Sequence, residues 1–200
     1  FSGGQLVRTM VEEKSNRIIE ILLTSCSMKE LLAGKIIGMS FLGLFQLFIW
    51  IVIGTVFLQA DFIGPDVKWL HIQLLYFLLT YILYSSVFIG FGSFITNDQD
   101  AQQLNTILSM VLIIPLFSSI LILRNPDSVL SLILTYFPFT SGPVILLRLN
   151  SNPPDLYEVV VSTAILLTTI VLMINFAARL FKDGIVSNEK ISFLKILFAR

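Results

Sequence analysis

The chain has 200 residues, of which 56% are hydrophobic and 13% are charged, and its formal net charge at pH 7 is zero. A soluble globular domain carries about 25% charged residues, so this composition excludes an ordinary soluble domain and indicates a membrane protein. Zero net charge gives no general attraction to nucleic acid, and we expect no nucleic-acid partner. Cys26 is the only cysteine, which excludes an internal disulfide and predicts a thiol.

The first predicted element is an amphipathic helix over residues 8–23. Helical spacing places its apolar residues on one face, namely Val11, Ile18, Ile19, Leu22 and Leu23. The other face is polar and carries Arg8, Glu12, Glu13, Asn16, Arg17 and Glu20. Arg8 with Glu12, and Glu13 with Arg17, are i,i+4 pairs that stabilise an exposed helix by about 0.2–0.5 kcal/mol each. We expect this helix to lie along the inner membrane surface.

A second helix is predicted to begin near Met28. Ser27 and Glu30 form an S-x-x-E capping box, in which each side chain accepts a hydrogen bond from the backbone N–H of the other residue. Cys26 and Leu31 are placed as the accompanying hydrophobic staple. Residues 1–35 are therefore predicted as a cytoplasmic region from which the chain turns sharply into the membrane.

Four later stretches are long and apolar enough to cross a bilayer, whose hydrocarbon core requires about 20 apolar residues per helix. The predicted spans are about residues 36–58, 70–95, 104–123 and 159–178, within a transmembrane domain of residues 36–180. A further apolar segment, residues 127–147, contains Pro138, Gly142 and Pro143, which we expect to break any continuous helix. We predict that it forms an external re-entrant segment. The predicted fold class is an all-α membrane protein.

The distribution of basic residues predicts the orientation of these spans. The N-terminal segment carries Arg8, Lys14, Arg17, Lys29 and Lys35, and the C-terminal end carries Arg179, Lys182, Lys190, Lys195 and Arg200. Lys68, Arg124 and Arg148 would lie on the opposite side of the membrane. The positive-inside rule then places both ends of the chain in the cytoplasm, including a basic tail of residues 181–200, and the protein in the cell membrane.

Several small or amide residues lie in or beside the predicted spans. Gly34 and Gly38 have the G-x-x-x-G spacing that allows close helix approach, and Gln46 and Asn175 place amides inside spans. Helix packing and a substrate pathway are both open for these four positions. The middle of each predicted span has no Asp, Glu, Lys, Arg or His, so a transport function would draw its energy from elsewhere. We identify no catalytic constellation and no metal site.

The charged segment resembles a known family. Residues 12–22, EEKSNRIIEIL, followed by residues 27–35, are similar to the E-E-K-x-x-R-x-x-E-I-L segment of ABC-2 type transporter permeases, especially sodium-exporting ones. The resemblance implies the C-terminal portion of a six-span permease, whose coupling helix docks on a separate ABC ATPase subunit. The coupling residues that it implies are Glu12, Glu13, Lys14, Arg17 and Glu20. It further implies ATP-Mg bound in that partner, no cofactor in this chain, a second permease copy and contact with membrane lipid.

Two alternatives and the substrate stay open. Residues 12–17 also satisfy the E-E-x-x-x-R motif of an intramembrane protease, but such a site needs histidines, and His71 is the only one, on the predicted opposite face of the membrane. A membrane scaffold that recruits a partner without transport is the second alternative. If the chain transports, then sodium, lipid, peptide and other small molecules are all possible substrates.

Overall fold

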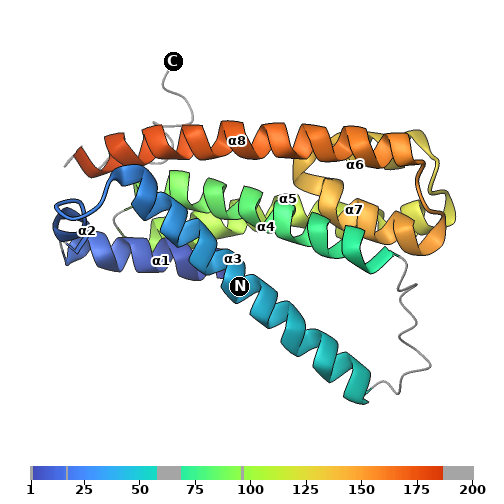
Figure 1. The fold of residues 1–200 in the computed structure, drawn as a ribbon, viewed down its shortest axis with the longest axis horizontal. Coiled ribbons are helices and arrows are strands. Elements are labelled where there is room, and N and C mark those ends of the chain that lie inside the picture. The colour runs from blue at the N-terminus through green and yellow to red at the C-terminus, as the bar shows by residue number, and fades with distance from the viewer. Residues whose placement is uncertain (1, 17, 58–68, 96, 187–200) are drawn as a thin grey trace. The chain divides into compact units, whose positions relative to one another are not determined.

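The computed structural model describes residues 2–16, 18–57, 69–95 and 97–186. These residues form α-helices with no strand, which confirms the predicted all-α fold class (Figure 1). The helices are α1 (Ser2–Ser15), α2 (Ile18–Leu22), α3 (Met28–Phe57), α4 (Leu70–Gly92), α5 (Asp98–Arg124), α6 (Val129–Tyr136), α7 (Pro138–Ser151) and α8 (Leu156–Val186). The chain divides into two compact units: unit 1 holds residues 1–39, 83–109 and 171–200, and unit 2 holds residues 40–82 and 110–170.

Four of the described helices are long and apolar enough to cross a membrane, as predicted. The candidate spans are Glu30–Gly54, Leu70–Gly92, Gln99–Arg124 and Leu156–Leu180. Three of these helices, α3, α5 and α8, continue through charged residues at which the sequence-based spans stop, because a charged residue at a membrane surface is compatible with helix. The fourth, α4, ends at Gly92, before the predicted end at residue 95. For example, α5 begins at Asp98, since the Asn97 side chain accepts a hydrogen bond of 2.8 Å from the backbone N–H of Asp100. Residues 187–200 of the predicted tail lie outside the described residues.

The amphipathic segment is divided into two helices, so the prediction of one helix over residues 8–23 is wrong in this respect. α1 ends at Ser15, Asn16 lies in a turn, and α2 is short. The apolar side of α1 is buried inside unit 1 through Val7, Met10 and Val11. A Cβ built on Gly92, the last residue of α4, would lie 3.4 Å from Val7 and 3.5 Å from Met10. The apolar face of α1 therefore packs on protein.

The predicted re-entrant segment forms two helices, α6 and α7, joined at Phe137. Pro138 is the first residue of α7, a position where the missing N–H of proline leaves no helical hydrogen bond unmade. The predicted break in the helix is confirmed before Pro138. Gly142 and Pro143 lie inside α7, so the expectation that these two residues would break a helix is wrong. Hydroxyl groups satisfy nearby carbonyls, since Thr140 donates to Leu134 O at 2.8 Å and Ser141 donates to Pro138 O at 3.0 Å.

The two helices of this pair share an apolar core inside unit 2. Leu134 of α6 and Val144 of α7 are buried together with Ile122 near the end of α5, and Leu147 packs against the same cluster. Burial of these side chains holds α6 and α7 together. Entry and exit of the pair at one face of the membrane stays a prediction.

Candidate functional site

The capping box at the start of α3 is confirmed. The Glu30 carboxylate accepts hydrogen bonds from the backbone N–H and the hydroxyl of Ser27, both at 2.7 Å, and the Glu30 N–H donates to the Ser27 hydroxyl at 3.4 Å. The cap satisfies N–H groups that the first helical turn leaves without helical partners. It fixes Met28 as the first residue of the helix that continues into the first candidate span.

The charged face of α1 is exposed at Arg8 and Glu12. The Arg8 Nε and Glu12 Oε1 atoms are 3.5 Å apart, which confirms the predicted i,i+4 pair. Both side chains are well exposed, at 67% for Arg8 and 61% for Glu12. An exposed pair of this kind contributes little to stability, about 0–1 kcal/mol.

Glu13, the neighbour of Glu12, points to a different part of unit 1. Its carboxylate accepts a hydrogen bond of 2.5 Å from the Lys35 ammonium, which lies on α3 and is 22 residues away in the sequence. Sequence reasoning paired Glu13 with Arg17, and Arg17 lies outside the described residues. Lys35 was predicted only as a basic residue of the cytoplasmic side. The structure therefore separates the adjacent glutamates into an exposed one and one that joins two helices.

The side chains of the other predicted coupling residues, Lys14 and Glu20, lie outside the described part of the chain. The four positions predicted for packing or a pathway are all exposed. A Cβ built on Gly34 or Gly38 would meet no atom within 4 Å. The Asn175 amide donates to the Val171 carbonyl of its own helix at 2.9 Å, and Gln46 is exposed on α3. Their role in packing or in a pathway stays a prediction.

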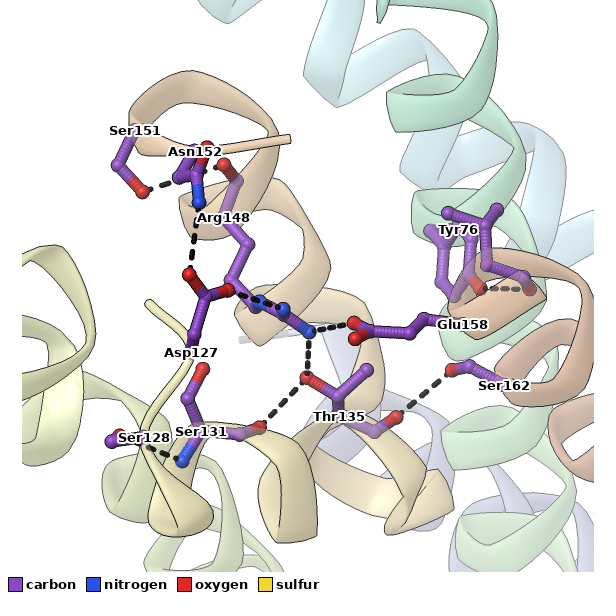
Figure 2. Close-up of polar contacts among 11 residues, drawn as sticks. Tyr76, Asp127, Ser128, Ser131, Thr135, Arg148, Ser151, Asn152, Glu158 and Ser162 are labelled. Carbon is purple, nitrogen blue, oxygen red and sulfur yellow. Dashed lines mark hydrogen bonds and ion pairs between the residues drawn. The ribbon is translucent and has the colours of Figure 1, made fainter. Parts of the chain in front are cut away.

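A second polar cluster, centred on Arg148 of α7, lies in unit 2 (Figure 2). The Arg148 side chain is 1% exposed. Its Nη1 group donates to Glu158 Oε2 at 2.5 Å and to Thr135 Oγ1 at 3.2 Å. Its Nη2 group donates to Asp127 Oδ1 at 3.3 Å. The guanidinium therefore joins α6, α8 and the loop before α6.

Further hydrogen bonds extend this cluster to Asn152 and Ser162, and a separate hydrogen bond joins α4 to α8. The Asn152 amide donates to the second oxygen of Asp127 at 3.0 Å, and the Ser162 hydroxyl of α8 donates to the Thr135 carbonyl at 2.9 Å. The Tyr76 hydroxyl of α4 donates to the Val159 carbonyl of α8 at 3.0 Å. Figure 2 shows Glu158 and Ser162 facing α6 and α7 from α8. The network thus holds the α6–α7 pair to α8.

Sequence reasoning missed this cluster because its members are far apart in the chain. In the sequence, Arg148 indicates only a side of the membrane, and Asp127 and Glu158 are not among the candidate site residues. One local signal existed: Arg148 is the only Lys or Arg between Arg124 and Arg179, and it directly follows the apolar run of residues 144–147. An isolated cation in such sequence requires a carboxylate or carbonyl partner.

A family model described as "ABC-2 family transporter protein" matches residues 1–179. The chain belongs to the ABC-2 transporter family. This confirms the resemblance carried by residues 12–22 and favours the transporter interpretation over the protease alternative. With its candidate spans, the ABC-2 chain is a multi-pass membrane protein.

Two curated relatives match most of this ABC-2 chain. "Uncharacterized protein MJ1024" of Methanocaldococcus jannaschii is 35% identical over 188 residues, which cover 94% of this chain and 47% of the relative. "Uncharacterized protein YhaP" of Bacillus subtilis is 26% identical over 197 residues, which cover 92% of this chain and 47% of the relative. The chain spans about half the length of the curated relatives it matches. No solved structure gives a significant match.

Proposed function

We propose that this chain is part of the permease subunit of an ATP-driven ABC-2 exporter, and that a separate ATPase subunit docks on the exposed face of α1. The observation that carries the proposal is the two-sided character of α1. Its apolar side is buried in unit 1 at Val7 and Met10, while its other side presents the exposed Arg8 and Glu12. A helix held in this way can receive a partner on one face and pass the force to the helices on the other.

The energy source in this proposal is the partner subunit, which binds ATP-Mg. This chain binds no cofactor in the proposal and hydrolyses nothing. Support comes from family membership and from the predicted spans, whose middle parts have no Asp, Glu, Lys, Arg or His to couple to an ion gradient. Both ends of the chain are cytoplasmic in this arrangement, so that α1 can reach the ATPase.

The proposed pathway also needs spans beyond those of this chain. In the proposal, further spans of the permease and a second permease copy complete the pathway in contact with membrane lipid. The exposed faces at Gly34, Gly38, Gln46 and Asn175 are available for those contacts or for the pathway. The transported substance is sodium, a lipid, a peptide or another small molecule.

Charge reversal at Glu12 tests the docking. In the full-length protein, Glu12→Lys should weaken ATPase binding about tenfold, equivalent to about 1.4 kcal/mol, because it places a cation where the partner meets an anion. Co-purification of the ATPase at several salt concentrations measures this effect. Arg124→Glu, which reverses an exposed charge at the end of α5, is the control and should leave binding unchanged.

Normal ATPase association with Glu12→Lys, in protein that inserts normally into membranes, would argue against docking on this face. The scaffold alternative gives a different result. A scaffold binds its partner without changing the partner's activity, whereas a permease subunit changes the rate of ATP hydrolysis. Measuring ATP hydrolysis of the complex and of the isolated ATPase therefore separates the two functions.

A further inference from the structure

The ion pair between Glu13 and Lys35 differs from the other ion pair of α1. Glu13 and Lys35 are 27% and 17% exposed, whereas Glu12 and Arg8 are 61% and 67% exposed. The exposed pair lies within one helix, while the shielded pair joins α1 to α3. Screening by water and salt is weaker for partly buried charges, so the Glu13–Lys35 pair forms the stronger connection.

Lys35 is well placed to move together with the first candidate span. It lies inside the continuous helix α3, whose first turn is fixed by the Ser27–Glu30 cap. The covalent path from α1 to Lys35 passes through α2 and a hydrogen-bonded turn that ends at Cys26. The ion pair bypasses this path and connects the two helices directly.

Contacts with α4 and α5 also hold α1 in unit 1. Val7 and Met10 pack on Gly92, and a Cβ built on Gly4 would lie 3.0 Å from the Asn105 side chain of α5. Apolar packing is non-directional. It therefore attaches α1 to α4 without fixing the position of α1 along α3. A charge-assisted hydrogen bond has a preferred distance and direction, and it fixes that position.

We propose that the Glu13–Lys35 pair transmits movement of α1 to the first membrane span, and that Glu13 is a positioning residue outside the ATPase docking face. The inference rests on the proposed docking of an ATPase on α1. It assigns different roles to two adjacent glutamates: Glu12 contacts the partner, and Glu13 holds α3. It also adds Lys35 to the residues required for coupling.

Charge exchange between the two helices tests this role in the full-length complex reconstituted in liposomes. The measured quantities are ATPase co-purification and the ratio of ATP hydrolysis by the complex to that by the isolated ATPase. Glu13→Lys and Lys35→Glu should each retain co-purification and reduce the effect of the permease on hydrolysis about tenfold. The double variant E13K/K35E should recover at least half of the lost effect, because it restores an ion pair of opposite polarity.

The pair Arg8–Glu12 provides the matched control. The exchange R8E/E12R also preserves an ion pair but reverses the exposed face, so it should lose co-purification. If R8E/E12R binds the ATPase normally, the proposed docking face is wrong. If Glu13→Lys loses co-purification, Glu13 belongs to the docking face and the positioning role is overturned.

Three further outcomes decide the positioning role. It is supported when the single variants lose the effect on hydrolysis and the double variant regains it. It is overturned when the single variants keep that effect, or when the double variant remains as impaired as they are. If a charge reversal fails to insert into membranes, Glu13→Gln and Lys35→Met remove the ion pair without placing like charges together, and the same loss at retained co-purification is expected.

Discussion

Replacing Arg148 with methionine should lower the free energy of unfolding of this ABC-2 protein by about 3–5 kcal/mol. The substitution keeps most of the side-chain volume but removes the cation that faces Glu158 and Asp127. Glu158 is mostly shielded from solvent, so its carboxylate would be left without its positive partner in a poorly solvated place. The Thr135 hydroxyl would lose the same donor. Thermal unfolding of the full-length protein in detergent measures the loss.

Two further variants distinguish loss of the ion pair from a nonspecific loss of stability. Arg124→Met removes an exposed cation at the end of α5 and should change stability by less than about 0.5 kcal/mol. The double variant R148M/E158Q should recover part of the loss, because it removes the unpaired carboxylate as well as the cation. Wild-type stability of Arg148→Met would show that the cluster does not hold the α6–α7 pair in place.

Gly142→Ala should destabilise unit 2 by about 1–3 kcal/mol, the usual cost of overpacking a closely packed site. A Cβ on Gly142 of α7 would collide with the Thr80 hydroxyl of α4 and would lie 3.0 Å from Thr80 Cβ. The Thr80 hydroxyl is buried without a hydrogen-bond partner among the described residues. The Thr80 hydroxyl occupies the space that a side chain at position 142 would need. Thermal unfolding in detergent checks this prediction also.

Gly34→Ala is the matched control, since it makes the same chemical change in a helix where a Cβ meets no atom within 4 Å. It should be neutral or stabilising by up to about 1 kcal/mol, because alanine is the better helix former. Thr80→Ala combined with Gly142→Ala should restore part of the stability, as it removes the colliding oxygen. Equal stability of Gly142→Ala and Gly34→Ala would refute the close contact between α4 and α7.

The features that sequence predicted correctly are local ones. Ser27 and Glu30 are three residues apart, and the capping box needs no information from the rest of the chain. The Arg8–Glu12 pair likewise follows from helical spacing alone. The candidate spans follow from the number of apolar residues that a bilayer requires.

The features that sequence missed depend on contacts between distant residues. Local spacing could not reveal that tertiary structure brings Lys35 to the Glu13 carboxylate. Pro143 was expected to end a helix, yet α7 continues through it, in a segment where nearby hydroxyl groups satisfy backbone carbonyls. The partners of Arg148 lie on α6 and α8, so they can be identified only from the positions of these helices.

Site-specific photo-crosslinking from residue 16 tests the proposed coupling to an ATPase most directly. Asn16 is exposed in the turn that follows α1, beside the proposed docking face. In native membranes, a photoreactive residue there in the full-length protein should give a covalent adduct with a nucleotide-binding ATPase subunit. The same residue at position 151, exposed at the end of α7 and predicted on the opposite side, should give none. An ATPase adduct from position 151, or no ATPase adduct from position 16, would contradict the account.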